Sequence, residues 1–194
     1  FGFNAGSALA ADGAAGMALL ATHMSAAAGA LTWMLIEWIK HGKPSGLGAI
    51  TGMVAGLATI TPASGYVGPA GALVIGILAG LICFMATNYL KRTLKIDDTL
   101  DVFPVHGVGG ILGTLLTAVF ASNALGVFSG QEDIVILDQL GIQAIGVIAV
   151  VAYTAIATFI ILKVTDMLAG NRVDEEEELE GLDLVLHNER GYDL

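Results

Sequence analysis

The sequence predicts an all-α polytopic membrane protein. Of its 194 residues, 55% are hydrophobic and only 13% are charged, and the mean hydropathy is +0.77. Soluble domains carry roughly 25% charged residues and about 7% glycine, whereas this chain has 26 glycines. Because a lipid-exposed segment must satisfy its own backbone hydrogen bonds, these apolar stretches are expected to form helices.

Five apolar stretches approach the roughly 20 residues that a spanning helix needs. They are residues 14–39, 47–63, 69–90, 103–121 and 139–168. The first dozen residues are typical of the end of a sixth span. Since the sequence starts at Phe1, with neither Met nor a signal-peptide pattern, we expect it to be the C-terminal portion of a longer protein.

Acidic residues concentrate at the end of the chain. Residues 170–194 hold nine acidic and two basic residues, and so carry −7 of the formal net charge of −10. We therefore expect a transmembrane helical domain over residues 1–169 and an acidic tail over residues 170–194. With eight basic residues and a pI near 4.5, the chain offers no basic surface for nucleic acid.

The basic residues predict the orientation in the membrane. If the spans alternate, all of them fall on one side, which the positive-inside rule makes cytoplasmic. This set is Lys40, Lys43, Lys91, Arg92, Lys95, Lys163, Arg172 and Arg190. Residue 1 is then expected near the outer face and the acidic tail inside. Trp33, Trp38 and Tyr89 are expected to anchor the helices at the membrane interfaces.

Glycines recur four residues apart in three of the predicted spans. They are Gly48, Gly52 and Gly56, then Gly76 and Gly80, then Gly109 and Gly113. Small residues at this spacing let two helices approach closely. The pattern favours helix packing, and the alternative is that the small side chains leave room for a narrow conduit.

The sequence shows no nucleophile triad, metal cluster or phosphate-binding loop, so we expect neither an enzyme nor a cofactor. His106 is the one residue that could carry chemistry inside a span, since an uncharged apolar stretch follows it. An ionisable group within a span is energetically costly and is a candidate functional residue by default. The alternative is a structural histidine that bonds a helix carbonyl.

Four segments resemble the ammonium transporter (Amt/Mep/Rh) family, in its Amt branch. Residues 1–7 read FGFNAGS, residues 61–68 read TPASGYVG, and residues 97–107 read DDTLDVFPVHG. The tail segment 180–192 is similar to that family's cytoplasmic C-terminal region, although Asn188 and Gly191 depart from its usual glycine and alanine. The resemblance implies the ammonium-transporter fold, from the end of the sixth span through the eleventh plus the tail.

The resemblance also implies roles for individual residues. Phe3 matches a phenylalanine that caps the pore entrance, and Ser7 matches a serine hydroxyl at an outer ammonium site. His106 matches the second of a pair of pore histidines. The implied function is transmembrane transport, in which ammonium binds outside, loses its proton, and crosses as ammonia past His106. The alternative is an ammonium sensor in nitrogen regulation.

Three aspartates, Asp97, Asp98 and Asp101, precede the His106 segment on the predicted cytoplasmic side. They are expected to cap the helix that follows, where Pro104 lies in the first turn. The alternative is a role at the inner mouth, where they would attract the reprotonated cation. For the tail, the resemblance implies a regulatory element of a homotrimer in the plasma membrane, with a PII-type protein as a possible partner.

Overall fold

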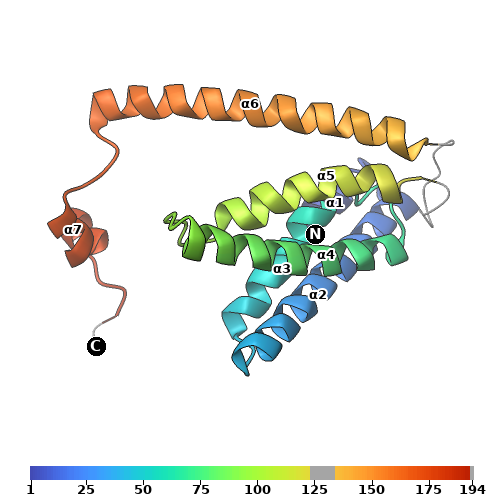
Figure 1. The fold of residues 1–194 in the computed structure, drawn as a ribbon, viewed down its shortest axis with the longest axis horizontal. Coiled ribbons are helices and arrows are strands. Elements are labelled where there is room, and N and C mark those ends of the chain that lie inside the picture. The colour runs from blue at the N-terminus through green and yellow to red at the C-terminus, as the bar shows by residue number, and fades with distance from the viewer. Residues whose placement is uncertain (123–133, 193–194) are drawn as a thin grey trace. The chain divides into compact units, whose positions relative to one another are not determined.

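The computed structural model describes residues 1–122 and 134–192, and over these ranges its regular structure is all helical. Figure 1 shows the order of the helices. The first compact unit covers Phe1–Val147 and the second covers Ile148–Leu194. The elements are α1 (Gly2–Gly6), α2 (Gly13–His41), α3 (Gly46–Ile60), α4 (Pro69–Asn88), η1 (Tyr89–Thr93), η2 (Phe103–Val108), α5 (Gly109–Phe120), α6 (Ile136–Ala169), α7 (Glu175–Glu180) and α8 (Leu182–His187).

Local chemistry fixes several helix ends. The Asp12 side chain caps α2 by accepting from the backbone N–H groups of Ala14 and Ala15, at 3.0 and 3.2 Å. Gly42 ends α2 with a φ of 76°, a left-handed conformation that glycine adopts without strain. The Ser45 hydroxyl then accepts from Gly48 N at 2.8 Å and caps α3.

Four helical stretches are long and apolar enough to cross a membrane: Gly13–His41, Pro69–Thr93, Phe103–Phe120 and Ile136–Ala169. They match four of the predicted spans and confirm the prediction of an all-α polytopic membrane protein. The second and third of these stretches include the short π-helical segments η1 and η2.

The predicted span over roughly residues 47–63 corresponds to α3, which ends at Ile60. Helix α3 has 15 residues and stops at Ile60, where Ala63 N bonds Ile60 O at 2.8 Å with the spacing of a turn. Pro62 lies inside that turn and has no N–H with which to continue the helix. At about 1.5 Å per residue, α3 is shorter than the roughly 30 Å thickness of the hydrocarbon core.

The spaced glycines lie where helix backbones meet. A Cβ on Gly56 of α3, or on Gly76 of α4, would overlap the Ser25 carbonyl oxygen of α2. A Cβ on Gly80 would lie 2.8 Å from the Gly29 carbonyl oxygen. Helix α2 is therefore the element on which α3 and α4 both pack, and the prediction of close helix packing at these glycines is confirmed.

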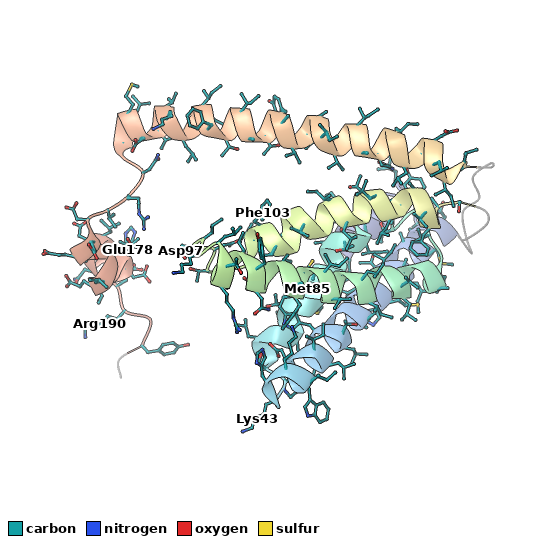
Figure 2. All side chains as sticks on the ribbon, in the orientation of Figure 1. Lys43, Met85, Asp97, Phe103, Glu178 and Arg190 are labelled. Atoms are coloured by element: carbon teal, nitrogen blue, oxygen red, sulfur yellow. The ribbon has the colours of Figure 1, made fainter. Side chains whose placement is uncertain are left out.

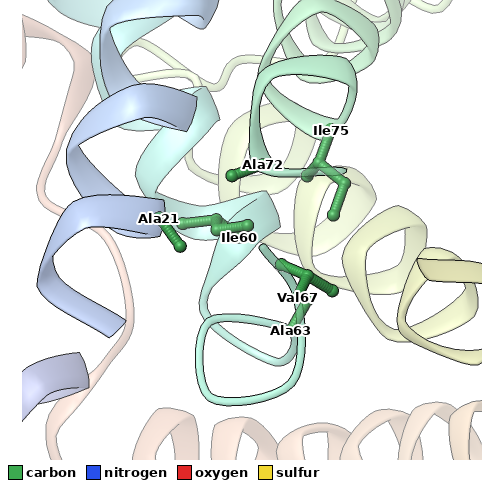
Figure 3. Close-up of a cluster of buried hydrophobic side chains, with 6 residues drawn as sticks. All are labelled: Ala21, Ile60, Ala63, Val67, Ala72 and Ile75. Carbon is green, nitrogen blue, oxygen red and sulfur yellow. The ribbon is translucent and has the colours of Figure 1, made fainter. Parts of the chain in front are cut away.

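Two hydrophobic clusters complete the core of the first unit. Figure 3 shows the first, which groups Ile60 at the end of α3 and Ile75 of α4 with Ala63 and Val67 of the segment between these helices. The second contains Trp33, Phe84, Cys83 and Val105. Trp33 is only 4% exposed and packs edge-on against Phe84 at 5.2 Å, so the prediction that it anchors the membrane interface is wrong.

The second unit consists of the end of α6 and the tail helices α7 and α8. Side chains stand out along the whole of α6 (Figure 2), and none of its residues, all of which the structure describes, is buried. In the tail, the Arg172 guanidinium reaches both carboxylate oxygens of Glu178 at 3.1 Å. Asn188 ends α8 with a φ of 53°.

Candidate functional site

Phe3 lies in the short helix α1 and Ser7 is the residue that caps its C-terminus, so the two, four residues apart, share one helical face. The Phe3 ring is 79% exposed, and Ser7 is exposed beside it. The Ser7 hydroxyl donates to the Phe3 carbonyl oxygen at 2.8 Å. That bond uses the only proton of the hydroxyl, so the oxygen can take part in a further hydrogen bond only as an acceptor, through its two lone pairs. A ring face and an acceptor oxygen on one surface are groups that suit a small cation.

Asn4 is the buried residue of α1, and sequence reasoning assigned it no role. Its amide nitrogen donates to Thr22 Oγ1 of α2 at 3.0 Å and reaches Thr61 Oγ1 at 3.4 Å. Thr61 follows α3 directly and opens the turn before α4. The signal that the sequence offered was Asn4 itself, a polar side chain between Phe3 and Ser7 in an apolar segment. Its partners, 18 and 57 positions away, could not be identified without the fold.

His106 lies in η2, directly after two residues that the core holds in place. Pro104 and Val105 are buried, and Val105 belongs to the cluster that contains Trp33 and Phe84. The His106 side chain is exposed in this chain. Pro104 and Val105 therefore anchor η2 in the core, while the His106 imidazole stays exposed. Short π-helical segments are frequent at functional sites.

The three aspartates have different surroundings. Asp98 accepts from Val102 N at 2.9 Å and from Phe103 N at 2.8 Å, so its carboxylate caps the start of η2. Asp101 pairs with Lys91 of η1, with 2.7 Å between Nζ and Oδ1. Asp97 is exposed and accepts from the Thr99 hydroxyl at 3.1 Å. The segment that carries Asp97 and Phe103 is labelled in Figure 2.

The structure groups the predicted site residues into three places. Phe3 and Ser7 share a face of α1, the aspartates gather before η2, and His106 lies within η2. Within residues 1–122 and 134–192, no hydrogen bond links Phe3 or Ser7 to His106, and no three His, Cys, Asp or Glu side chains are grouped to hold a metal ion. The ring of His23 in α2 lies 5.5 Å from the Phe1 ring, centroid to centroid.

Known proteins place this fold and these motifs in one family. The model of the Ammonium Transporter Family matches residues 1–192. A putative ammonium transporter of Methanothermobacter thermautotrophicus is 45% identical over all of this chain and 48% of its own length. An ammonium transporter of Bacillus subtilis is 41% identical over 99% of this chain and 48% of its own length. The chain thus spans about half the length of these relatives.

Solved structures agree with the sequence relatives. A structure described as a sensor Amt protein has a TM-score of 0.86 and 33% identity, covering 96% of this chain and 45% of its own. The crystal structure of Candida albicans Mep2 has a TM-score of 0.80 and 37% identity, covering 91% and 40% of the two chains. The chain is a multi-pass membrane protein with the ammonium-transporter fold, and it belongs to the ammonium transporter family.

Proposed function

We propose that this chain forms part of a transporter that carries ammonium nitrogen across the plasma membrane. Ammonium binds at Phe3 and Ser7 on the outer side, loses its proton, and crosses as ammonia past His106. The observation that carries the proposal is the pairing on α1, where an exposed aromatic ring lies beside a hydroxyl whose proton is already used. Membership of the ammonium transporter family supplies the substrate class.

The outer pair suits ammonium through two kinds of contact. A cation over an aromatic face gains about 0.5–2 kcal/mol, depending on how far it is desolvated. The Ser7 oxygen, which donates to the Phe3 carbonyl, is left to accept an N–H of the cation. Both groups are uncharged, so they attract ammonium without the strong binding that a carboxylate would impose.

Deprotonation is the less costly way for ammonium to enter an apolar path. The idealised Born cost of moving such an ion into a medium with a dielectric constant of about 4 is on the order of 20 kcal/mol. Removing a proton from an amine with a pKa of about 9–10.5 at about pH 7 costs roughly 3–5 kcal/mol. Potassium has no proton to lose, so this path excludes it.

His106 is the polar partner that ammonia needs within the membrane. An imidazole can donate, accept or relay a proton near neutral pH. Residues 102–122 carry no Asp, Glu, Lys or Arg, so no permanent charge in this segment would hold the cation. We assign His106 to the conducting path and the release of the proton to a separate route.

The test is transport by a full-length transporter carrying this sequence, reconstituted in liposomes. An imposed ammonium gradient is expected to give a current or an internal pH change, and an equal potassium gradient is expected to give neither. The variant His106→Ala is expected to lose most ammonium-driven flux or its selectivity over potassium. Unchanged flux and selectivity in this variant would contradict the role of His106.

The aspartates before η2 could cap the helix or attract the cation at the inner mouth, and their contacts show which residue suits which role. Asp98 and Asp101 use their carboxylates on the η2 backbone and on Lys91. Asp97 is exposed, so the inner-mouth role that attracts the reprotonated cation falls to it. We therefore expect Asp97→Asn to lower the rate of ammonium release inside, measured as flux under a gradient that drives ammonium inward.

The tail proposal rests on charge and on the family. We propose residues 1–169 as the transmembrane domain and residues 170–194 as an acidic tail. The distribution of basic residues supports a cytoplasmic tail, with residue 1 near the outer face. We propose that the tail couples the subunits of a homotrimer and offers a surface to a PII-type regulatory protein. Protease or antibody access to the tail, from each side of oriented vesicles, tests its location.

A second function is sensing of ammonium. The solved structure described as a sensor Amt protein matches this chain with a TM-score of 0.86, which favours this alternative. The liposome experiment separates the two functions. Ammonium binding, measured by calorimetry, with neither current nor pH change would indicate a sensor, whereas flux would indicate a transporter.

A further inference from the structure

The hydrogen bonds around Asn4 have a fixed direction. Thr22 Oγ1 donates to Ala18 O at 2.6 Å, and Thr61 Oγ1 donates to Leu57 O at 2.7 Å. A hydroxyl has one proton, so both threonine oxygens can only accept from a third group. Position 4 must therefore supply two N–H donors, which the NH₂ group of an asparagine provides and an apolar side chain does not.

These bonds act on the helix that carries Phe3. Helix α1 covers Gly2–Gly6, and Asn4 is its buried residue. Its tertiary contacts include the Asn4 bonds and the packing of Phe1 on His23 at 5.5 Å.

Burial distinguishes the two sides of α1. Asn4 is 7% exposed, whereas its neighbour Phe3 is 79% exposed. Successive side chains of a helix point about 100° apart, because one turn takes about 3.6 residues. Holding the Asn4 amide against Thr22 and Thr61 therefore fixes the rotation of α1 about its axis, and with it the face on which Phe3 and Ser7 lie.

We infer that Asn4 is a positioning residue for the outer ammonium site. Its two donated hydrogen bonds lock α1 to α2 and to the turn after α3, so that the Phe3 ring and the Ser7 oxygen face a cation together. The inference rests on the proposed function, because it concerns the affinity of that site for ammonium. It also explains why segments 1–7 and 61–68, distant in the sequence, meet at Asn4 and Thr61.

The experiment measures ammonium-driven current against ammonium concentration in proteoliposomes of a full-length transporter carrying this sequence. Asn4→Leu removes the donors with little change of size, and Thr22→Val removes one acceptor. Thr22→Ser, which keeps the hydroxyl, is the matched control. We expect the half-saturating concentration to rise about tenfold in Asn4→Leu and about fivefold in Thr22→Val, as the loss of one or two ordinary hydrogen bonds predicts.

Comparing the half-saturating concentration with the maximal current distinguishes a residue that positions the site from one that only stabilises the fold. Maximal current per folded transporter is expected to change by less than about twofold in both variants, which marks lost binding. Thr22→Ser is expected to keep the half-saturating concentration of the parent. Because Asn4→Leu already removes the bond to Thr22, the double variant Asn4→Leu with Thr22→Val is expected to match Asn4→Leu alone.

Several outcomes would overturn the inference. A half-saturating concentration that stays at the parent value in Asn4→Leu, or a fall in maximal current alone, assigns Asn4 to stability. If Asn4→Leu does not fold, the comparison of Thr22→Val with Thr22→Ser decides, and failure of Thr22→Val to fold also counts against the inference. Absence of current in the parent protein, by contrast, is a failure of the proposed function itself.

Discussion

Helices α4 and α6 are both apolar enough to cross a membrane, yet the fold uses them differently. In the stretch formed by α4 and η1, half of the most apolar window is buried, whereas in α6 none of it is. Gly76 and Gly80 of α4 meet the backbone of α2, while Gly141 and Gly146 of α6 have nothing within 4 Å of a Cβ position. Apolar composition alone therefore does not mark the close helix contacts of the first unit, whereas the small residues of α4 that meet the α2 backbone do.

The largest effect is expected from filling a glycine contact. Gly76→Leu forces a side chain into the Ser25 carbonyl of α2, and an overpacked backbone contact is expected to destabilise the protein by about 3 kcal/mol or more. The measurement is thermal unfolding of a full-length transporter in detergent. Gly146→Leu in α6 is the matched control, and an equal loss in both variants would contradict the comparison.

A smaller effect is expected from shortening a packed side chain. Ile75 of α4 is fully buried, whereas Ile156 of α6 is 63% exposed. Ile75→Ala leaves a cavity and is expected to lower the free energy of unfolding by about 2–4 kcal/mol. Ile156→Ala is expected to change it by less than about 0.5 kcal/mol. Denaturation monitored by circular dichroism checks both, and similar values would show that α6 is as well packed as α4.

Helix caps extend the comparison to the tail. Asp98 accepts two backbone N–H groups at the start of η2, whereas the Asp174 side chain makes no capping bond to α7. Asp98→Ala is therefore expected to cost about 1–2 kcal/mol of stability, and Asp174→Ala much less. Protection of the Val102 and Phe103 amides in hydrogen exchange gives the local readout. Unchanged protection in Asp98→Ala would rule out the cap.

The smallest effect is expected from the two ion pairs. Lys91 and Asp101 are 38% and 17% exposed, whereas Arg172 and Glu178 are 74% and 49% exposed. Lys91→Met is expected to cost at most about 1 kcal/mol, less as salt is added, because exposed pairs contribute little and are screened. Arg172→Met is expected to leave the unfolding temperature unchanged. A salt-independent loss in Lys91→Met would indicate packing by the lysine stem.

The predicted spans differ from the observed helices where backbone chemistry overrides apolarity. Residues 61–63 continue an apolar stretch, yet the chain turns after Ile60 because Pro62 cannot extend the helix hydrogen bonds. Trp33 fits an interfacial pattern by its position, but α4 supplies Phe84 as a partner and buries it. Both differences arise from features that a hydropathy window does not measure.

The candidate site likewise combines features that the sequence predicts with features that depend on the fold. The i+4 spacing of Phe3 and Ser7 is enough to predict that they share one face, because helical periodicity is local. The different contacts of Asp97, Asp98 and Asp101 were not predictable, since they depend on where Lys91 and the η2 backbone lie. Asn4 was missed because its partners belong to α2 and to the turn after α3.

The sequence by itself determined that the chain is helical and lies in a membrane, and its motifs indicated the family. These properties follow from composition and from short-range spacing, which neighbours along the chain settle. Only the tertiary structure decided that α2 is the element on which α3 and α4 pack and that the Asn4 amide holds α1. Close approach and hydrogen bonding between distant segments depend on three-dimensional position, which the order of residues does not display.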